Sequence, residues 1–183
     1  MAMIAAVLAG GASRRMGEPK AGLDLGGRTL LERAVAVARA AGLEPVVVAK
    51  ARSALPAVDA ERWPEPDAPR HPLTGIVAAL ARAGPNGIVA LACDTPLLPA
   101  PLLVALAARD ALTLVRTPDG RLHPLPGRYP QAAAAPLAEA LAAGAPLQRT
   151  LLDLGAEILD EPDADALLNV NRPEDLARAR ERA

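Results

Sequence analysis

A glycine-rich segment that contains several cations carries the residue types that bind phosphate. It spans residues 8–20 and reads LAGGASRRMGEPK. Gly10 and Gly11 follow a short apolar run, so the backbone can turn sharply there and aim consecutive N–H groups at one anion. One of the paired arginines and Lys20 place positive charge where the oxygens of a triphosphate would lie. The segment indicates a phosphate site, although it is neither a GxGxxG fingerprint nor a Walker A loop.

The alternative interpretation of this segment is a glycine-rich turn whose arginines are solvated. The glycines alone do not separate the two interpretations. The order Ser13, Arg15, Gly17 and Lys20, directly after a buried strand, favours the phosphate site.

Asp94 stands at the end of a second apolar run, in the segment LACDTP at residues 91–96. A carboxylate in that position is costly to bury unless it has a partner. Mg²⁺ is a fitting partner, because it prefers oxygen ligands and bridges carboxylates to phosphates. The alternative is an aspartate that caps the following turn. We expect the neighbouring Cys93 to be a small core residue of the sheet.

A proline-rich loop and the start of a helix offer candidate contacts to a nucleotide base. In the segment HPLTG at residues 71–75, Gly75 lies near the expected helix start, where a nucleotide backbone or base edge could approach closely. Thr74 is expected to be the N-cap of this helix. Upstream, the carboxylate of Asp67 could accept hydrogen bonds from a base N–H and an amino group. A solvated loop aspartate is the alternative there.

Two asparagines near the C-terminal end form a further polar group. Asn169 and Asn171 alternate in the segment LNVNRPED, so an extended backbone places them on the same side. They either complete a polar site or make Asx turns before the last helix. His71 and His123 are interpreted from the residues alone as loop or packing residues.

The composition excludes several classes of function. The chain has 183 residues, of which 51% are hydrophobic and 22% charged, with a formal net charge of −1, so no broad field attracts nucleic acid. One Trp, one Tyr and no Phe leave few stacking platforms, and one cysteine excludes an internal disulfide and a cysteine-based zinc site. Since no membrane span or signal peptide is recognisable, we expect a soluble, cytoplasmic, single domain over residues 1–183.

Short apolar runs alternate with helical patterns along the chain. The expected strands are 4–9, 46–48, 61–63, 88–93, 111–116, 122–129 and 156–159. The expected helices are 29–41, 74–83, 99–110, 131–143, 146–154 and 173–182. Thr29 is a plausible N-cap of the first helix and Gly42 a plausible stop.

This alternation predicts an α/β fold with a mainly parallel sheet covered by helices on both faces, that is, three α/β/α layers. In such sheets ligands bind beyond the carboxyl ends of the strands. The rule brings together the loop after Ala9 and Asp94, which lie far apart in the sequence.

The segments together resemble the nucleotidyltransferase family of molybdenum cofactor guanylyltransferase. The resemblance covers nearly the whole chain and is carried by LAGGASRRMGEPK at 8–20, HPLTG at 71–75, ACDTP at 92–96, HPLPGRY at 123–129 and NVNRPEDL at 169–176. It implies a Rossmann-like nucleotidyltransferase fold. It also implies Mg²⁺-dependent transfer of GMP from GTP to the molybdopterin form of the cofactor, with release of pyrophosphate.

The resemblance also implies roles for particular residues. The implied nucleotide-binding residues are Leu8, Ala9, Gly10, Gly11, Ser13, Arg15, Lys20, Asp67, Gly75 and Asp94. Arg15, Lys20 and Asp94 are the expected catalytic residues, and Asp94 is also the expected Mg²⁺ ligand. His123, Asn169 and Asn171 are expected on the side of the acceptor.

Three departures from the family pattern leave other substrates open. The family commonly has Gly at the position of His71, Thr at that of Arg172, and an Asn where Ala49 stands. One alternative is cytidylyl transfer to the same cofactor, or transfer to a sugar phosphate. Another is a nucleotide-binding carrier that catalyses no transfer. The family implies an insertion factor or an apo-molybdoenzyme as a partner, and neither a nucleic acid nor a membrane.

Overall fold

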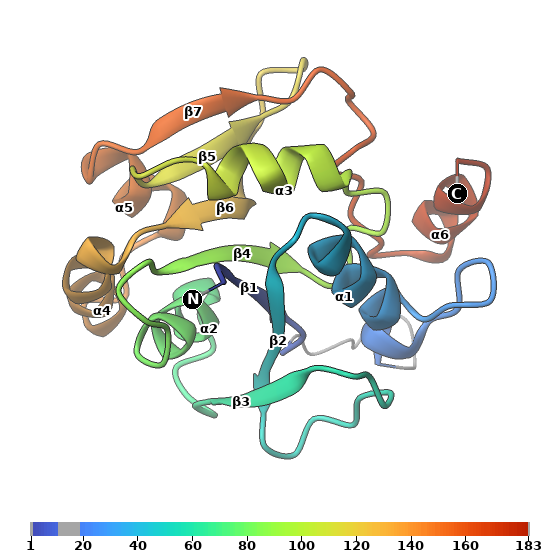
Figure 1. Cartoon of the computed structure of the whole chain (residues 1–183), viewed down its shortest axis with the longest axis horizontal. Coiled ribbons are helices and arrows are strands. Elements are labelled where there is room, and N and C mark those ends of the chain that lie inside the picture. Colours follow the sequence, from blue (N-terminus) through green and yellow to red (C-terminus); the bar gives the residue numbers. More distant parts are fainter. Residues whose placement is uncertain (1, 11–18, 183) are drawn as a thin grey trace.

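The computed structural model describes residues 2–10 and 19–182, and its strands form one seven-stranded sheet in the order β3-β2-β1-β4-β6-β5-β7 (Figure 1). The strands are β1 (Ile4–Leu8), β2 (Glu44–Lys50), β3 (Glu61–Glu65), β4 (Ile88–Ala92), β5 (Thr113–Arg116), β6 (Leu122–Tyr129) and β7 (Glu157–Asp160). All pairings are parallel except the two made by β6, so the predicted mainly parallel α/β sheet is confirmed.

Helices cover both faces of this sheet, as the alternating pattern predicts. The helices are α1 (Leu30–Ala40), α2 (Pro72–Leu80), α3 (Ala100–Ala107), α4 (Ala134–Ala142), α5 (Leu147–Asp153) and α6 (Pro173–Arg180), with short 3-10 turns η1 (Lys20–Gly22) and η2 (Gln131–Ala133). Successive strand residues point to opposite faces. Ala5 and Val7 therefore pack in one core with α1 and α3, while Ala6 packs in the other with α2, α4 and α5. The three-layer prediction is confirmed.

Side-chain caps mark the starts of α1 and α2. Thr29 caps α1 as predicted, in a reciprocal capping box with Glu32. The prediction that Thr74 caps the next helix is wrong. The N-cap of α2 is His71, whose Nδ1 accepts from the Leu73 backbone N–H at 3.2 Å. Pro72 can occupy the first helical position because its missing N–H would have no partner there. The helix therefore begins at residue 72, two residues earlier than the expected start at residue 74.

The direction of β6 is the main departure from a fully parallel sheet. Only residues 117–121 separate β5 from β6, too few for the crossover that parallel neighbours need. The two strands therefore form a hairpin, and β6 begins at the edge where β1 and β4 end. This brings Leu122 and His123 to the carboxyl edge of the parallel strands.

The carboxyl ends of β1, β2 and β4 lie level with one another. Leu8 is in register with Val48 and with Ala92. The Ala9 N–H donates to the Val48 carbonyl at 2.9 Å, and the Cys93 N–H donates to the Leu8 carbonyl at 3.2 Å. The loop after β1 and the residue after Cys93 therefore leave the sheet side by side. None of the helices described is long and apolar enough to cross a membrane.

Gly87 allows the chain to enter β4 past the end of β6. Its φ is +70°, and a Cβ at this position would lie 2.3 Å from the Tyr129 carbonyl oxygen and 2.7 Å from the Gln131 nitrogen. Both neighbours are backbone atoms, so they cannot move aside cheaply. Gly84, three residues earlier, has open space where its Cβ would be.

We expect Gly87→Ala to lower the free energy of unfolding by at least about 1–3 kcal/mol, because it combines backbone strain with a backbone clash. Gly84→Ala is the matched control and should change stability by less than about 0.5 kcal/mol. Urea unfolding of both variants measures the difference. Equal stability of the two variants would contradict the close packing of Gly87 against the backbone of Tyr129 and Gln131.

Candidate active site

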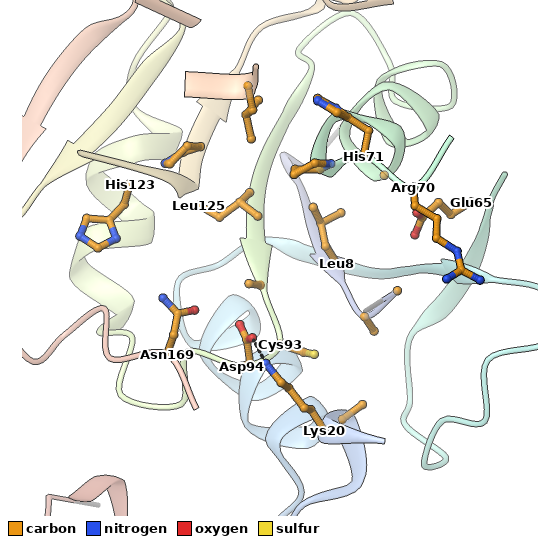
Figure 2. Close-up of a pocket in the computed structure, with 18 of the residues that line it drawn as sticks. Leu8, Lys20, Glu65, Arg70, His71, Cys93, Asp94, His123, Leu125 and Asn169 are labelled. Atoms are coloured by element: carbon orange, nitrogen blue, oxygen red, sulfur yellow. Dashed lines mark hydrogen bonds and ion pairs between the residues drawn. The ribbon is translucent and has the colours of Figure 1, made fainter. Parts of the chain in front are cut away.

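A cavity of about 1320 Å³ opens at the carboxyl edge of the sheet. Pockets for one small ligand usually hold about 300–1000 Å³, so this one has room for two substrates. Figure 2 shows His123 and Asn169 on one side, Glu65, Arg70 and His71 on the other, and Lys20 and Asp94 between them. We call the two sides the β6 end and the β3 end of the cavity.

Lys20 and Asp94 form the centre of this cavity. The Lys20 ammonium lies 3.0 Å from Asp94 Oδ2, and both side chains are 21% exposed. Lys20 also donates to the side-chain oxygen of Asn171. The Val170 N–H donates to the Asp94 backbone carbonyl at 2.8 Å, which fixes the segment of Asn171 beside the end of β4. Three distant parts of the chain therefore meet at one ammonium group.

The cap of α6 holds this asparagine segment in place. The backbone N–H groups of Asn171 and Arg172 both donate to Asp175 Oδ2 at 2.9 Å. Asn171 makes no Asx turn, because the residue two positions on is Pro173, which has no N–H to donate, and its side-chain oxygen accepts from Lys20 instead. Asn169 lines the cavity, and its amide lies 3.5 Å from the Leu167 carbonyl.

A carboxylate that the sequence did not single out forms the wall at the β3 end. Glu65 is the last residue of β3, in register with Lys50, and its side chain is 10% exposed. A Cβ on Gly10 would lie 2.1 Å from Glu65 Oε2, and one on Gly75 would lie 3.2 Å from the Leu8 side chain. Because Gly10 has no side chain, the Glu65 carboxylate can pack against it and still line the cavity.

Burial and one lysine act on Glu65 in opposite directions. Burial raises the pKa of this carboxyl above its ordinary value, and the nearby Lys50 ammonium partly offsets the increase. Lys50 Nζ lies 3.6 Å from Glu65 Oε1 but donates to the backbone carbonyls of Pro66 and Asp67 at 2.7 and 3.0 Å. The long ion pair leaves the carboxylate oxygens with capacity to accept hydrogen bonds from a ligand.

The structure places Asp67 differently from the expectation. Its side chain is exposed and is not part of the cavity wall, whereas its backbone carbonyl accepts from Lys50. The sequence pattern predicts a strand over 61–63 that ends before Pro64, which places Glu65 in the following loop. The strand continues through the proline because β3 is at the edge of the sheet, where a missing N–H is tolerated.

Most of the other predicted site residues line the cavity, and three lie outside the described part of the chain. The cavity wall contains Leu8, Ala9, Gly10, Lys20, Gly75, Asp94, His123 and Asn169. Gly11, Ser13 and Arg15 lie outside the described residues. Cys93 is 8% exposed, as predicted for a core residue, and burial together with the charge of Asp94 raises its pKa to about 12.

Comparison with known proteins finds relatives over nearly the whole chain. Residues 5–161 match the family described as MobA-like NTP transferase domain. Over 98% of its length the chain is 39% identical to a molybdenum cofactor guanylyltransferase of Cereibacter sphaeroides, covering 96% of that protein. It is 40% identical to a probable molybdenum cofactor guanylyltransferase of Opitutus terrae, covering 98% of this chain and 95% of that one.

A similar fold occurs in a solved structure. The crystal structure of molybdopterin-guanine dinucleotide biosynthesis protein A from Archaeoglobus fulgidus superposes with a TM-score of 0.76 at 24% identity. The match covers 98% of this chain and 97% of that one. At this identity the likeness shows the fold alone.

Proposed function

The chain belongs to the MobA-like NTP transferase family, and from that premise we propose that it transfers GMP from GTP to molybdopterin. The products are the guanine dinucleotide form of the cofactor and pyrophosphate. The observation that carries this proposal is the contact between Lys20 and Asp94 at the carboxyl edge, between two ends of one large cavity. The names of the curated relatives support the choice of base and acceptor.

The arrangement of the cavity suits a reaction between two bound substrates. The nucleoside would occupy the β3 end, beside Gly10, Gly75 and Glu65, and the acceptor would occupy the β6 end, beside His123 and Asn169. The phosphates would then lie between them, against Lys20. Gly11, Ser13 and Arg15 follow β1 and remain proposed phosphate contacts.

The chemistry requires positioning and charge neutralisation more than covalent participation by the protein. An oxygen of the acceptor's terminal phosphate attacks the α-phosphorus of GTP, and the bond from that phosphorus to the bridging oxygen of the β-phosphate breaks. Pyrophosphate leaves with the electron pair. Lys20 contributes a compact positive charge beside the transferred group.

The residues at the centre fit a magnesium ion. The described residues contain no cluster of three His, Cys, Asp or Glu side chains that would hold a metal alone. Mg²⁺ needs only one or two carboxylates when substrate phosphates supply further oxygens. Asp94 Oδ1 accepts no hydrogen bond within the described part of the chain, so it is available for this role. Bound there, the ion would neutralise charge on the phosphates.

Glu65 replaces Asp67 as our proposed contact to the base. A carboxylate only accepts hydrogen bonds, and it accepts two in parallel. Guanine offers two adjacent donors, the ring N1–H and the 2-amino group, whereas cytosine offers an amino group beside a ring acceptor. The Glu65 carboxylate lines the cavity and packs against Gly10, where a Cβ would lie 2.1 Å from Oε2. This match favours GTP over CTP.

We expect the protein with Mg²⁺ and molybdopterin to release pyrophosphate and form the guanine dinucleotide when GTP and CTP compete at equal concentration. Chromatography of the products measures the outcome. A cytosine product would support the alternative of cytidylyl transfer. Nucleotide binding without any molybdopterin-dependent pyrophosphate release would support the carrier alternative and contradict the proposed reaction.

In the same assay, we expect Asp94→Asn to lower turnover by at least about 100-fold, because it removes the charge that would hold Mg²⁺ and that orients Lys20. Asp153→Asn is the matched control, since Asp153 is an exposed residue of α5 that, among the residues described, pairs only with Arg149. Thermal unfolding checks that both variants are folded. Near-normal turnover of a folded Asp94→Asn protein would contradict the metal assignment.

We expect Glu65→Gln to lower the use of GTP by about 10- to 100-fold and to raise the use of xanthosine triphosphate. The amide oxygen can accept from N1–H, and the amide N–H can donate to the 2-oxo group of xanthine. Glu61→Gln makes the same change at the other end of β3, where the side chain is exposed. If Asp67→Asn caused the switch and Glu65→Gln did not, the base contact would return to Asp67.

The remaining expectations concern the cellular setting. An insertion factor or an apo-molybdoenzyme as the recipient of the product, and a cytoplasmic location, stay predictions.

A further inference from the structure

A series of hydrogen bonds holds the His123 ring on the side that faces away from the cavity. His123 Nε2 lies 3.0 Å from Thr117 Oγ1, and Thr117 Oγ1 lies 2.6 Å from Asp119 Oδ1. The Arg121 N–H donates to the same Asp119 oxygen at 3.1 Å. All four residues belong to the β5–β6 hairpin, whose direction brings His123 to the carboxyl edge.

The protons in this chain can be assigned from the capacities of its members. The two hydrogen bonds from Thr117 and Arg121 lower the pKa of Asp119, so its carboxylate is ionised and only accepts. Thr117 has one hydroxyl proton, and the 2.6 Å contact with the ionised Asp119 oxygen requires it, because two oxygens that both present lone pairs repel each other. No hydroxyl proton then remains for His123. The histidine must therefore donate from Nε2 to Thr117 Oγ1.

A neutral imidazole that carries its proton on Nε2 has a free lone pair on Nδ1. Burial and the charge of Arg121 lower the pKa of His123, which keeps the ring neutral at pH 7. Within the described residues Nδ1 makes no hydrogen bond, and His123 lines the cavity. Figure 2 shows one ring nitrogen on the side of Asn169 and the other directed away from it. The hairpin thus presents a pure hydrogen-bond acceptor to the β6 end.

We propose that Asp119 and Thr117 are positioning residues that hold His123 in its Nε2–H form, so that Nδ1 accepts a hydrogen bond from a ring N–H or amino group of the acceptor substrate. This inference rests on the proposed function, because a pterin carries both kinds of donor. The β5–β6 hairpin would then select among acceptor substrates, because an acceptor whose ring has no N–H donor is bound less well. Asp119 and Thr117 act through His123 and do not touch the substrate.

The chain's two histidines make the tautomer directly measurable. In protein labelled with ¹⁵N-histidine, we expect the His123 ring to show the Nε2–H tautomer at pH 8, and Nδ1 to shift when molybdopterin is added. Thr117→Val should remove the preference for this tautomer. Thr117→Ser should keep it, because the hydroxyl is retained. Thr113→Val is the matched control, since Thr113 is a buried residue of β5 whose hydroxyl, within the described part of the chain, donates only to the Ala111 carbonyl.

Kinetics provide a second readout that loss of folding alone would not give. We expect Thr117→Val to raise the KM for molybdopterin by about 3- to 10-fold, the effect of one hydrogen bond, and to leave the KM for GTP unchanged. Asp119→Asn should act in the same direction. A structural role alone would lower the amount of active protein without separating the two KM values.

A His123 ring that carries its proton on Nδ1 in the unchanged protein would overturn the inference. So would equal tautomers and equal KM values in Thr117→Val and Thr113→Val. If Thr117→Val does not fold, the tautomer of the unchanged protein and the exposed Asp119→Asn variant decide the question. If molybdopterin supports no pyrophosphate release, the proposed function fails. The tautomer of His123 in the ligand-free protein still tests whether Thr117 and Asp119 fix the proton on Nε2.

Discussion

The ion pair between Lys20 and Asp94 is the contact on which the site depends. It joins residues 74 positions apart, and through Asn171 it reaches a residue a further 77 positions away, since Lys20 and Asn171 are separated by 151. The pair forms because β1 and β4 are parallel neighbours whose ends are level, so the segments that follow them leave the sheet together. This ion pair places an ammonium group and a carboxylate between the two ends of the cavity.

Each end of the cavity has its own physical origin. At the β3 end, Glu65 packs against Gly10, which has no side chain, and an edge strand continues through a proline to deliver that carboxylate. At the β6 end, a short hairpin reverses one strand and presents a neutral histidine. A parallel β6 would begin at the opposite edge of the sheet. The single antiparallel strand is therefore what gives the parallel sheet a second wall for an acceptor.

Much of this arrangement could be predicted from the sequence, because it follows from local patterns. The buried strands are continuous apolar runs, the cap at Thr29 has its own signature, and the rule for parallel sheets places Asp94 beside the loop after Ala9. The failures have physical reasons. His71, not Thr74, is the N-cap of α2, because Pro72 follows His71 and suits the first position of a helix. Glu65 was missed because prolines on both sides suggested a loop. The direction of β6 is a property of the five-residue connection, and was not read from the strand itself.

We expect the carboxyl edge around Lys20 and Asp94 to bind a nucleotide together with magnesium, and thermal unfolding measures that binding. A ligand at 100 times its Kd adds about 2.7 kcal/mol to the free energy of unfolding, which at this chain length is on the order of 5–10 °C. The unfolding midpoint should rise by this amount with GTP and Mg²⁺, and by much less with GTP and EDTA. An unchanged midpoint with millimolar GTP, CTP and ATP in the presence of Mg²⁺ would contradict this expectation.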